Sequence, residues 1–335
     1  MDMESQQKLK PSGAQRGAYW LISQMQPDGS FHNARSINEY YKAAFGLVIS
    51  GHNLEADRLL DYVSKTFLKN DGDLNGEGCV WFEDFRIYAH CWLLMAALMR
   101  GRFEIVHPLL SFVAKYHDET SGGFFQKTAG SQQRKGVQEV MTTGLAGLAC
   151  LWGGHLDIAE KTGQWMENLY QAQPNLSKGL YFVWDSRSGL VTEFPKEESK
   201  SFMIDARETQ QRYYQYGIAA AFLSSLSAAT GVKKWLALAD EFLKSSKHCR
   251  EDVYREPQSG KIGWGAAWTY RLTNNPEDLR IAQEVASGLG ALQSEHGWWS
   301  TLNVYQHQMA KKLEPGLDIT GEFVSLLGCM ELVLR

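Results

Sequence analysis

Four polar side chains of this 335-residue chain could donate hydrogen bonds to a reacting carbonyl group: Arg86, His90, Gln211 and Tyr214. Arg86 and His90 are four residues apart in FEDFRIYAHCW, a spacing that puts both on one face of a helix. A donor aimed at a carbonyl oxygen polarises the carbonyl and stabilises charge that develops during the reaction. We therefore predict that these four residues are the catalytic groups.

A second set of residues, most of them aromatic, is expected to bind the substrate. They occur at the predicted beginnings of apolar helices or in glycine-rich loops, so several would converge on one cavity. Core packing would explain any single member equally well. The set consists of Tyr40, Trp81, Met141, Thr142, Trp264, Trp268, Trp298 and Trp299.

Acidic residues near the same helix beginnings allow a different chemistry. Glycosidases, lyases and sugar epimerases need paired carboxylates or proton-transfer groups near one another. Four glutamates could supply such a pair: Glu83, Glu139, Glu208 and Glu322. Helix dipoles also attract carboxylates to helix beginnings without any catalysis, which explains Glu83, Asp84, Asp205 and Asp318. Both interpretations stay open at this point.

Metal and cofactor motifs are weak in this sequence. The segment from Asp71 to Gly76, DGDLNG, begins like a calcium-binding loop, but Phe82 stands where that loop needs a glutamate. No D-x-D-D, H-E-x-x-H or G-x-S-x-G motif occurs. We expect neither a metal nor a cofactor.

Composition narrows the class of protein. The net charge of −4 and the pI near 6.2 argue against a nucleic-acid partner. No apolar run reaches the roughly 18 residues that a membrane span needs, and the N-terminus lacks the pattern of a signal peptide. Five scattered cysteines without a C-x-x-C pair suggest a cytoplasmic protein. We expect a monomer or weak homodimer.

Helical periodicity divides the chain into two alternating sets of helices. The first set carries charges along one face, as helices exposed to solvent do, and spans 13–25, 53–68, 102–116, 155–172, 232–247 and 276–293. The second set is apolar or small on nearly all sides, which indicates burial, and spans 37–50, 83–100, 137–151, 206–229, 262–273 and 317–334.

Connections between the helices are as asymmetric as the helices. Each short connection, after a buried helix, contains glycine or asparagine, which end helices in the left-handed conformation. The long connections, of about 11 to about 33 residues, all precede buried helices and would gather at one end. The pattern predicts an all-α (α/α)6 toroid of twelve helices in six hairpins, with the cavity mouth at the inner-helix N-termini. We expect one domain over 1–335, with 1–12 flexible.

Two loops resemble the repeats of a known fold family. QMQPDGSF (24–31) and QSEHGWW (293–299) are similar to the Q-x-x-D-G-x-W repeats of squalene/hopene-cyclase-type toroids, within the terpenoid cyclase and protein prenyltransferase-like class. SGKIGWGAA (259–267) resembles toroid proteins of fungal secondary metabolism. The resemblance implies a cofactor-independent cyclase or isomerase, most specifically an intramolecular Diels–Alderase, acting on a hydrophobic terpenoid- or polyketide-derived molecule.

Three alternatives to that function remain. A carbohydrate-active toroid enzyme would use paired carboxylates, and its sugar-stacking aromatics would look the same in sequence. A carrier would hold a metabolite without converting it. An interaction subunit would use a surface such as the charged segment 195–201, PKEESKS, although a solvated insertion explains that segment equally well.

Overall fold

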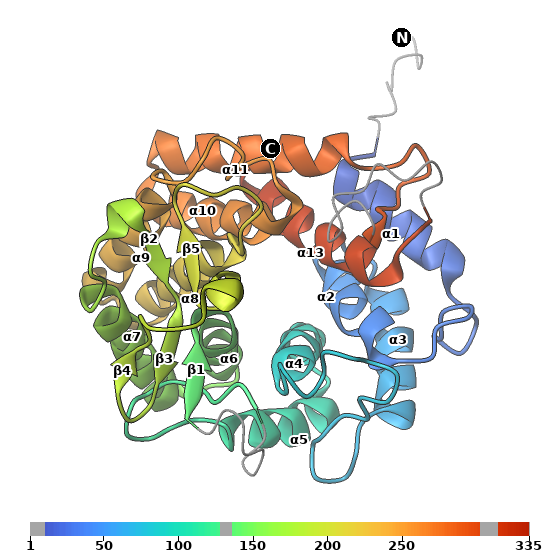
Figure 1. Ribbon diagram of the computed structural model, residues 1–335. Helices are drawn as coiled ribbons and strands as arrows, with labels where there is room; N and C mark the ends of the chain where they lie inside the picture. The colour runs from blue at the N-terminus through green and yellow to red at the C-terminus, as the bar shows by residue number, and fades with distance from the viewer. Residues whose placement is uncertain (1–10, 128–135, 302–313, 335) are drawn as a thin grey trace.

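Twelve helices of nine or more residues form a double ring in the computed structural model, which describes residues 11–127, 136–301 and 314–334 (Figure 1). The outer helices are α1 (Gly13–Gln24), α3 (Asn53–Thr66), α5 (Phe103–Ala114), α7 (Leu156–Gln171), α9 (Lys233–Ser246) and α11 (Pro276–Ala291). The inner helices are α2 (Tyr41–Ile49), α4 (Tyr88–Arg100), α6 (Val140–Trp152), α8 (Tyr214–Thr230), α10 (Gly260–Thr273) and α13 (Leu317–Leu334). The predicted (α/α)6 toroid is confirmed.

Contacts between inner helices close the ring. Each inner helix contacts the next one along the chain, and α13 contacts α2. The outer helix α1 lies against α13, where Ser12 caps α1 and its Oγ donates a hydrogen bond to Glu331 at 2.6 Å. Most of the segment 1–12, which is expected to be flexible, lies outside the described part of the chain, namely residues 1–10.

Burial separates the two sets of helices as the sequence predicted. Every residue of α6 from Val140 to Cys150 is buried, whereas α3 buries one stripe of Ala56, Leu59, Leu60 and Val63. Small residues allow the inner helices to approach closely. A Cβ atom on Gly217 of α8 would lie 2.0 Å from the carbonyl of Lys261 in α10. No helix in the described ranges is both long and apolar enough to cross a bilayer.

Helix ends agree with the prediction better than helix beginnings. Gly101, Gly231 and Asn274 end α4, α8 and α10 with φ of 66°, 72° and 54°. By contrast, α4 begins at Tyr88 instead of residue 83, and α8 begins eight residues later than predicted. The delay of α8 has a local cause, because residues 203–205 form a strand and Gln210 adopts a left-handed φ of 58°.

The sequence did not predict two small antiparallel sheets, whose strands lie in the longest connection except for β1, which directly precedes α6. β1 (Val137–Glu139) pairs with β3 (Val183–Asp185), which pairs with β4 (Gly189–Leu190). β2 (Gly179–Tyr181) pairs with β5 (Met203–Asp205). In Figure 1 these strands lie beside α6, α7 and α8, so they anchor the 173–205 connection on one side of the mouth.

The glycine-rich loops share one structure that explains their repeated sequence. Gly29 and Gly297 have φ of 90° and 98°, and each lies against the backbone of an outer helix, where a Cβ atom would meet a carbonyl oxygen at 2.1 Å and 2.4 Å. The aromatic residue two positions later is buried. Its backbone N–H donates to an inner-helix hydroxyl, as Trp299 does to Thr320 Oγ1 at 3.0 Å. The repeats therefore bind outer helices to inner ones.

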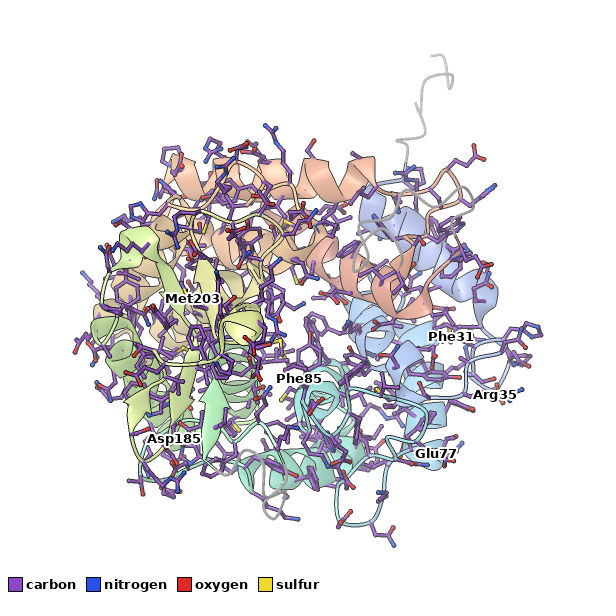
Figure 2. The ribbon with its side chains drawn as sticks, in the orientation of Figure 1. Phe31, Arg35, Glu77, Phe85, Asp185 and Met203 are labelled. Atoms are coloured by element: carbon purple, nitrogen blue, oxygen red, sulfur yellow. The ribbon has the colours of Figure 1, made fainter. Side chains whose placement is uncertain are left out.

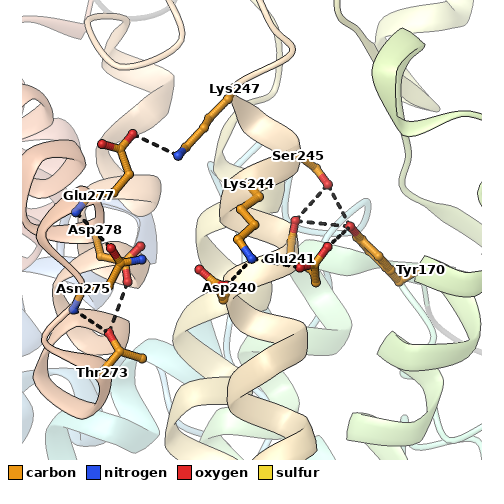
Figure 3. Close-up of polar contacts among 10 residues, drawn as sticks. All are labelled: Tyr170, Asp240, Glu241, Lys244, Ser245, Lys247, Thr273, Asn275, Glu277 and Asp278. Atoms are coloured by element: carbon orange, nitrogen blue, oxygen red, sulfur yellow. Dashed lines mark hydrogen bonds and ion pairs between the residues drawn. The ribbon is translucent and has the colours of Figure 1, made fainter.

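Polar contacts join the outer helices α7, α9 and α11 (Figure 3). Tyr170 of α7 lies 2.9 Å from Ser245 Oγ of α9, and Lys247 at the end of α9 pairs with Glu277 of α11 at 3.0 Å. Asp278, which is almost fully buried, accepts a hydrogen bond from Thr273 Oγ1 at 3.3 Å. Burial, and then the nearby charge of Asp240, raise the pKa of Asp278 to about 6.

We expect Asp278→Asn to stabilise the fold at pH 7. Between about pH 4 and pH 6 Asp278 is protonated in the folded protein, whereas in the unfolded chain its carboxyl group has already ionised. The free energy of unfolding therefore falls as pH rises from about 4 to 6. The variant removes this loss, and its free energy of unfolding at pH 7 should exceed that of the wild type by about 1–2 kcal/mol. Urea titrations at pH 4 and pH 7 measure the difference. A variant less stable than wild type at pH 7 would contradict the assignment.

Candidate functional site

A cavity of about 730 Å³ opens where the long connections meet the N-terminal ends of the inner helices. All six inner helices supply lining residues at or close to their first turns, or in the segments that immediately precede them. Five aromatic side chains line it: Tyr41, Trp81, Phe85, Tyr88 and Tyr214. Figure 2 shows Phe85 near the centre of the ring, whereas Arg35, Glu77 and Asp185 lie at its periphery.

A buried ionic cluster lies in this cavity. Lys42 of α2 approaches Asp318 Oδ1 at 2.9 Å and Glu322 Oε2 at 2.5 Å, and Lys261 of α10 pairs with Glu322 Oε1. Asp318 and Glu322 are four residues apart on α13, so they share one face of that helix. Because Glu322 receives one lysine on each oxygen, it joins α2 to α10 through α13.

The two carboxylates of the ionic cluster have opposite pKa shifts. Burial raises the pKa of Asp318, and the single close lysine, Lys42, only partly opposes this effect. Burial would also raise the pKa of Glu322, but the charges of Lys261 and Lys42 outweigh it and lower that pKa to about 2. Burial opposes the charge on Lys261, yet Glu322 raises its pKa, so this lysine stays protonated. Asp318 is therefore the carboxyl group of the cluster that takes up a proton more readily.

The spacing of the carboxylates restricts the chemistry. Both Asp318 Oδ1 and Glu322 Oε2 contact Lys42 Nζ, so these oxygens are separated by no more than the sum of the two contacts, about 5.4 Å. A retaining glycosidase places its carboxyl groups about 5–5.5 Å apart with the sugar carbon between them. In this protein the ammonium group of Lys42 contacts both carboxylates, at the position that the sugar carbon takes in a retaining glycosidase.

Two of the four residues predicted to be catalytic line the cavity. Tyr214 lies near the ionic cluster, with its ring centroid 5.5 Å from Lys261 Nζ. Gln211 also lines the cavity, but its Nε2 donates to the carbonyl of Thr209 at 2.9 Å and its Oε1 accepts from the N–H of Asp205 at 3.4 Å. The side chain of Gln211 thus holds its own loop.

Arg86 and His90 lie outside the cavity lining, in a second polar cluster. Arg86 donates to Asp73 Oδ2 at 2.6 Å, and His90 Nε2 lies 3.4 Å from Asp73 Oδ1. The imidazole stacks on Phe112 of α5 with 4.6 Å between ring centroids, so this face of α4 points to the outer helix. Burial lowers the pKa of His90, which is therefore neutral at pH 7.

Among the residues predicted to bind substrate, Trp81 and Met141 line the cavity. Trp264 is fully buried one turn deeper along α10 than Lys261, and its ring is 5.7 Å from that of Trp92 and 5.2 Å from that of Trp268. These rings pack inside the barrel, outside the cavity lining.

The other four predicted binding residues are elsewhere. Tyr40 is buried against Phe31 of the first glycine-rich loop, and Trp299 donates its indole N–H to the carbonyl of Leu289. Thr142 donates to Glu139 Oε1 at 3.0 Å in the core. Trp298 lines a separate outer pocket beside α1.

Sequence reasoning missed Lys42 and Lys261, although it identified Glu322 as a candidate acid. Both lysines occur within otherwise apolar or small segments, YYKAAFGLVI and SGKIGWGAA. Lysine is almost never fully buried unless it is paired. A single lysine within, or directly before, a helix predicted to be buried on all sides was therefore the available signal for an internal ion pair.

Comparison with known proteins shows similarity of the fold, but not of the sequence. No family model and no curated protein matches the sequence. The D-mannose isomerase structure superposes with a TM-score of 0.69 at 10% identity, covering 96% of each chain. The GH76A α-1,6-mannanase of Salegentibacter sp. HEL1_6 superposes with a TM-score of 0.63 at 14% identity, covering 96% of this chain and 98% of the mannanase. An unsaturated glucuronyl hydrolase specific for heparin reaches 0.62 at 10% identity, over 96% of each chain.

These findings correct the predicted function. The cyclase and Diels–Alderase prediction, including the individual likeness to the norbornene synthase of sordarin biosynthesis, is contradicted because the structural neighbours named above act on sugars. The cavity agrees with the correction, since it holds two lysines and two carboxylates where an apolar interior was expected. The expected hydrophobic substrate is set aside together with that prediction.

We expect Glu322→Gln to destabilise the fold strongly. The change leaves Lys42 and Lys261 buried without the anion they share, which costs about 3–5 kcal/mol. Because the folded pKa of Glu322 is about 2, its contribution is complete above about pH 4.5 and is lost as pH falls toward 2. Denaturant titrations at pH 7 and pH 3 should therefore show a larger difference at pH 7.

Glu83→Gln is the matched control for this variant, because Glu83 is 73% exposed and lies outside the cavity lining. It should change the free energy of unfolding by less than about 0.5 kcal/mol. Equal effects of both substitutions would show that the ionic cluster does not hold the inner helices together.

Proposed function

We propose that this protein is a carbohydrate-active enzyme that interconverts sugars by moving a proton at a carbon next to a carbonyl group, as isomerases and epimerases do. The observation that carries the proposal is the ionic cluster of Lys42, Lys261, Asp318 and Glu322 inside the cavity. Titratable groups whose pKa values are pushed apart by their surroundings are typical of acid–base catalysis. The similarity to a D-mannose isomerase supports this reaction class.

Each member of the ionic cluster has a distinct role in this proposal. Asp318, which its raised pKa makes a stronger base, takes in its ionised form the proton from the sugar carbon and returns it to the neighbouring carbon. The proton of the adjacent hydroxyl group moves to the former carbonyl oxygen, so that the two functional groups exchange places. The ammonium groups of Lys42 and Lys261 stabilise the negative charge that develops on the sugar oxygens. Glu322 remains ionised and keeps both lysines in place. The reaction rearranges hydrogen atoms within one molecule and needs no second substrate.

Hydrolysis of a glycosidic bond is less well supported by the same geometry. Both oxygens of Glu322 are occupied by lysines, so this residue is poorly placed to attack a sugar carbon. Variants of the Salegentibacter mannanase with two consecutive aspartates replaced are described as inactive. This chain contains no two consecutive aspartates, so it lacks that pair.

The remaining lining suits a small sugar. Ligand pockets commonly enclose about 300–1,000 Å³, and this cavity encloses about 730 Å³. Aromatic rings such as Trp81 and Tyr88 offer flat faces, and the amides of Asn38 and Gln258 offer hydrogen bonds to hydroxyl groups. Trp81 Nε1 donates to Asn38 Oδ1 at 3.0 Å, which fixes the orientation of both side chains.

We expect Asp318→Asn to reduce sugar interconversion by roughly 10²–10⁴-fold, because an amide cannot accept the proton. The assay incubates the protein with aldoses, ketoses and uronic acids in D₂O and follows deuterium incorporation at the carbon beside the carbonyl by NMR. Asp84→Asn, at an exposed acid outside the cavity lining, is the control and should retain full activity.

Three outcomes of the D₂O assay are decisive. Deuterium incorporation that Asp318→Asn abolishes supports the proposal. Cleavage of α-linked oligosaccharides without deuterium exchange would replace it with glycoside hydrolysis. Absence of any sugar conversion or binding would overturn the carbohydrate assignment itself.

A further inference from the structure

The cavity carries more positive than negative charge, although the chain as a whole is acidic. Its described lining contains the cations Lys42, Lys200, Arg212 and Lys261 but only the anions Asp318 and Glu322. The whole chain has a net charge of −4. A cleft with one dominant sign of charge concentrates ligands of the opposite sign.

The excess positive charge comes from Arg212 and Lys200, which belong to two segments in contact with each other. Lys42 and Lys261 are balanced by the two carboxylates of the ionic cluster. Arg212 and Lys200 have no carboxylate within ion-pair distance among the described residues. Arg212 Nη2 instead donates to Ser201 Oγ at 3.2 Å. The internal segments outside the described residues, 128–135 and 302–313, contain no aspartate or glutamate.

The loop that carries Arg212 is held in a strained conformation. Gln210 has a φ of 58°, which is uncommon for residues other than glycine. Asp252 maintains this shape by accepting hydrogen bonds from the Gln210 N–H at 2.9 Å and from the Tyr213 hydroxyl at 3.0 Å. Backbone strain of this kind concentrates at functional sites, where the surrounding structure enforces it. The strain here presents Gln210, Gln211 and Arg212 to the cavity.

We propose that the substrate is an anionic sugar whose carboxylate or phosphate group binds Arg212 and Lys200. This inference rests on the proposed function and specifies its substrate class. Arginine binds carboxylate and phosphate groups through two parallel hydrogen bonds, and Lys200 adds a second positive charge. Arg212 and Lys200 line the same cavity as Asp318 and the two lysines of the ionic cluster, so one bound molecule can contact both groups.

The binding test uses the full-length protein with four defined ligands. Isothermal titration calorimetry compares glucuronate and galacturonate with glucose and with mannose 6-phosphate. We expect each anionic sugar to bind at least 10-fold more tightly than glucose, and its affinity to fall as salt rises from 50 to 500 mM because salt screens exposed charges. Tighter binding of uronates or of the phosphate identifies which anionic group the site accepts.

Charge-removal variants test the two residues directly. Arg212→Gln should weaken binding of the anionic sugars by about 10–100-fold, because a hydrogen bond to a charged group contributes about 1.5–3 kcal/mol, and Lys200→Gln should weaken it less. Glucose affinity should be unchanged in both. Lys196→Gln, on the same 3-10 helix as Lys200, and Arg207→Gln, whose side chain pairs with Asp205, lie outside the lining and are the matched controls.

The outcomes separate this inference from the function on which it rests. Equal affinity for glucose and the anionic sugars, unaffected by Arg212→Gln, overturns the anionic substrate and leaves sugar interconversion standing. Equal losses in the control variants would also overturn it, because the effect would then arise from the overall charge of the protein. Failure of every sugar to bind overturns the proposed function instead.

Discussion

The bridge that Glu322 makes between Lys42 and Lys261 is the interaction on which the rest of the site depends. It joins the first turns of α2 and α10 to the second turn of α13, where the last inner helix of the chain meets the first. A carboxylate with one lysine on each oxygen satisfies all three charges, whereas any member alone would be a buried unpaired ion. The same contact that closes the ring therefore also creates the polar end of its cavity.

Helix composition made the architecture predictable. The alternation between helices with one charged face, such as α3, and helices buried on all sides, such as α6, identifies the outer and inner rings without any tertiary information. Gly101 and Gly231 mark helix ends because their conformations are local. The beginning of α8 was not predictable, because it depends on β5 pairing with β2 and on a hydrogen bond from Gln210 to the distant Asp252.

The candidate site was less predictable, for a geometric reason. Spacing shows that Arg86 and His90 share a face of α4, but it does not show whether that face points to the cavity or to α5. The stacking of His90 on Phe112 settles the question in favour of α5. Glu322 was recognised as an acid at a helix beginning. Its partners Lys42 and Lys261 were not, because 280 and 61 residues separate them from it in sequence.

Position along α13 explains why two similar carboxylates behave differently. Glu322, one turn further into the helix than Asp318, is reached by lysines from the helices on both sides, which lower its pKa to about 2. Within the described part of the chain, Asp318 forms an ion pair with Lys42 only, and Lys261 acts on it from farther away, so burial dominates and raises the pKa of Asp318. One turn of helix therefore separates a carboxylate that is paired on both oxygens and stays ionised from one whose pKa is raised by burial. A second cation beside Asp318 would remove this asymmetry by lowering the pKa of Asp318, and with it the feature on which the proposed proton transfer rests; stability gained in this way at a functional site commonly costs activity.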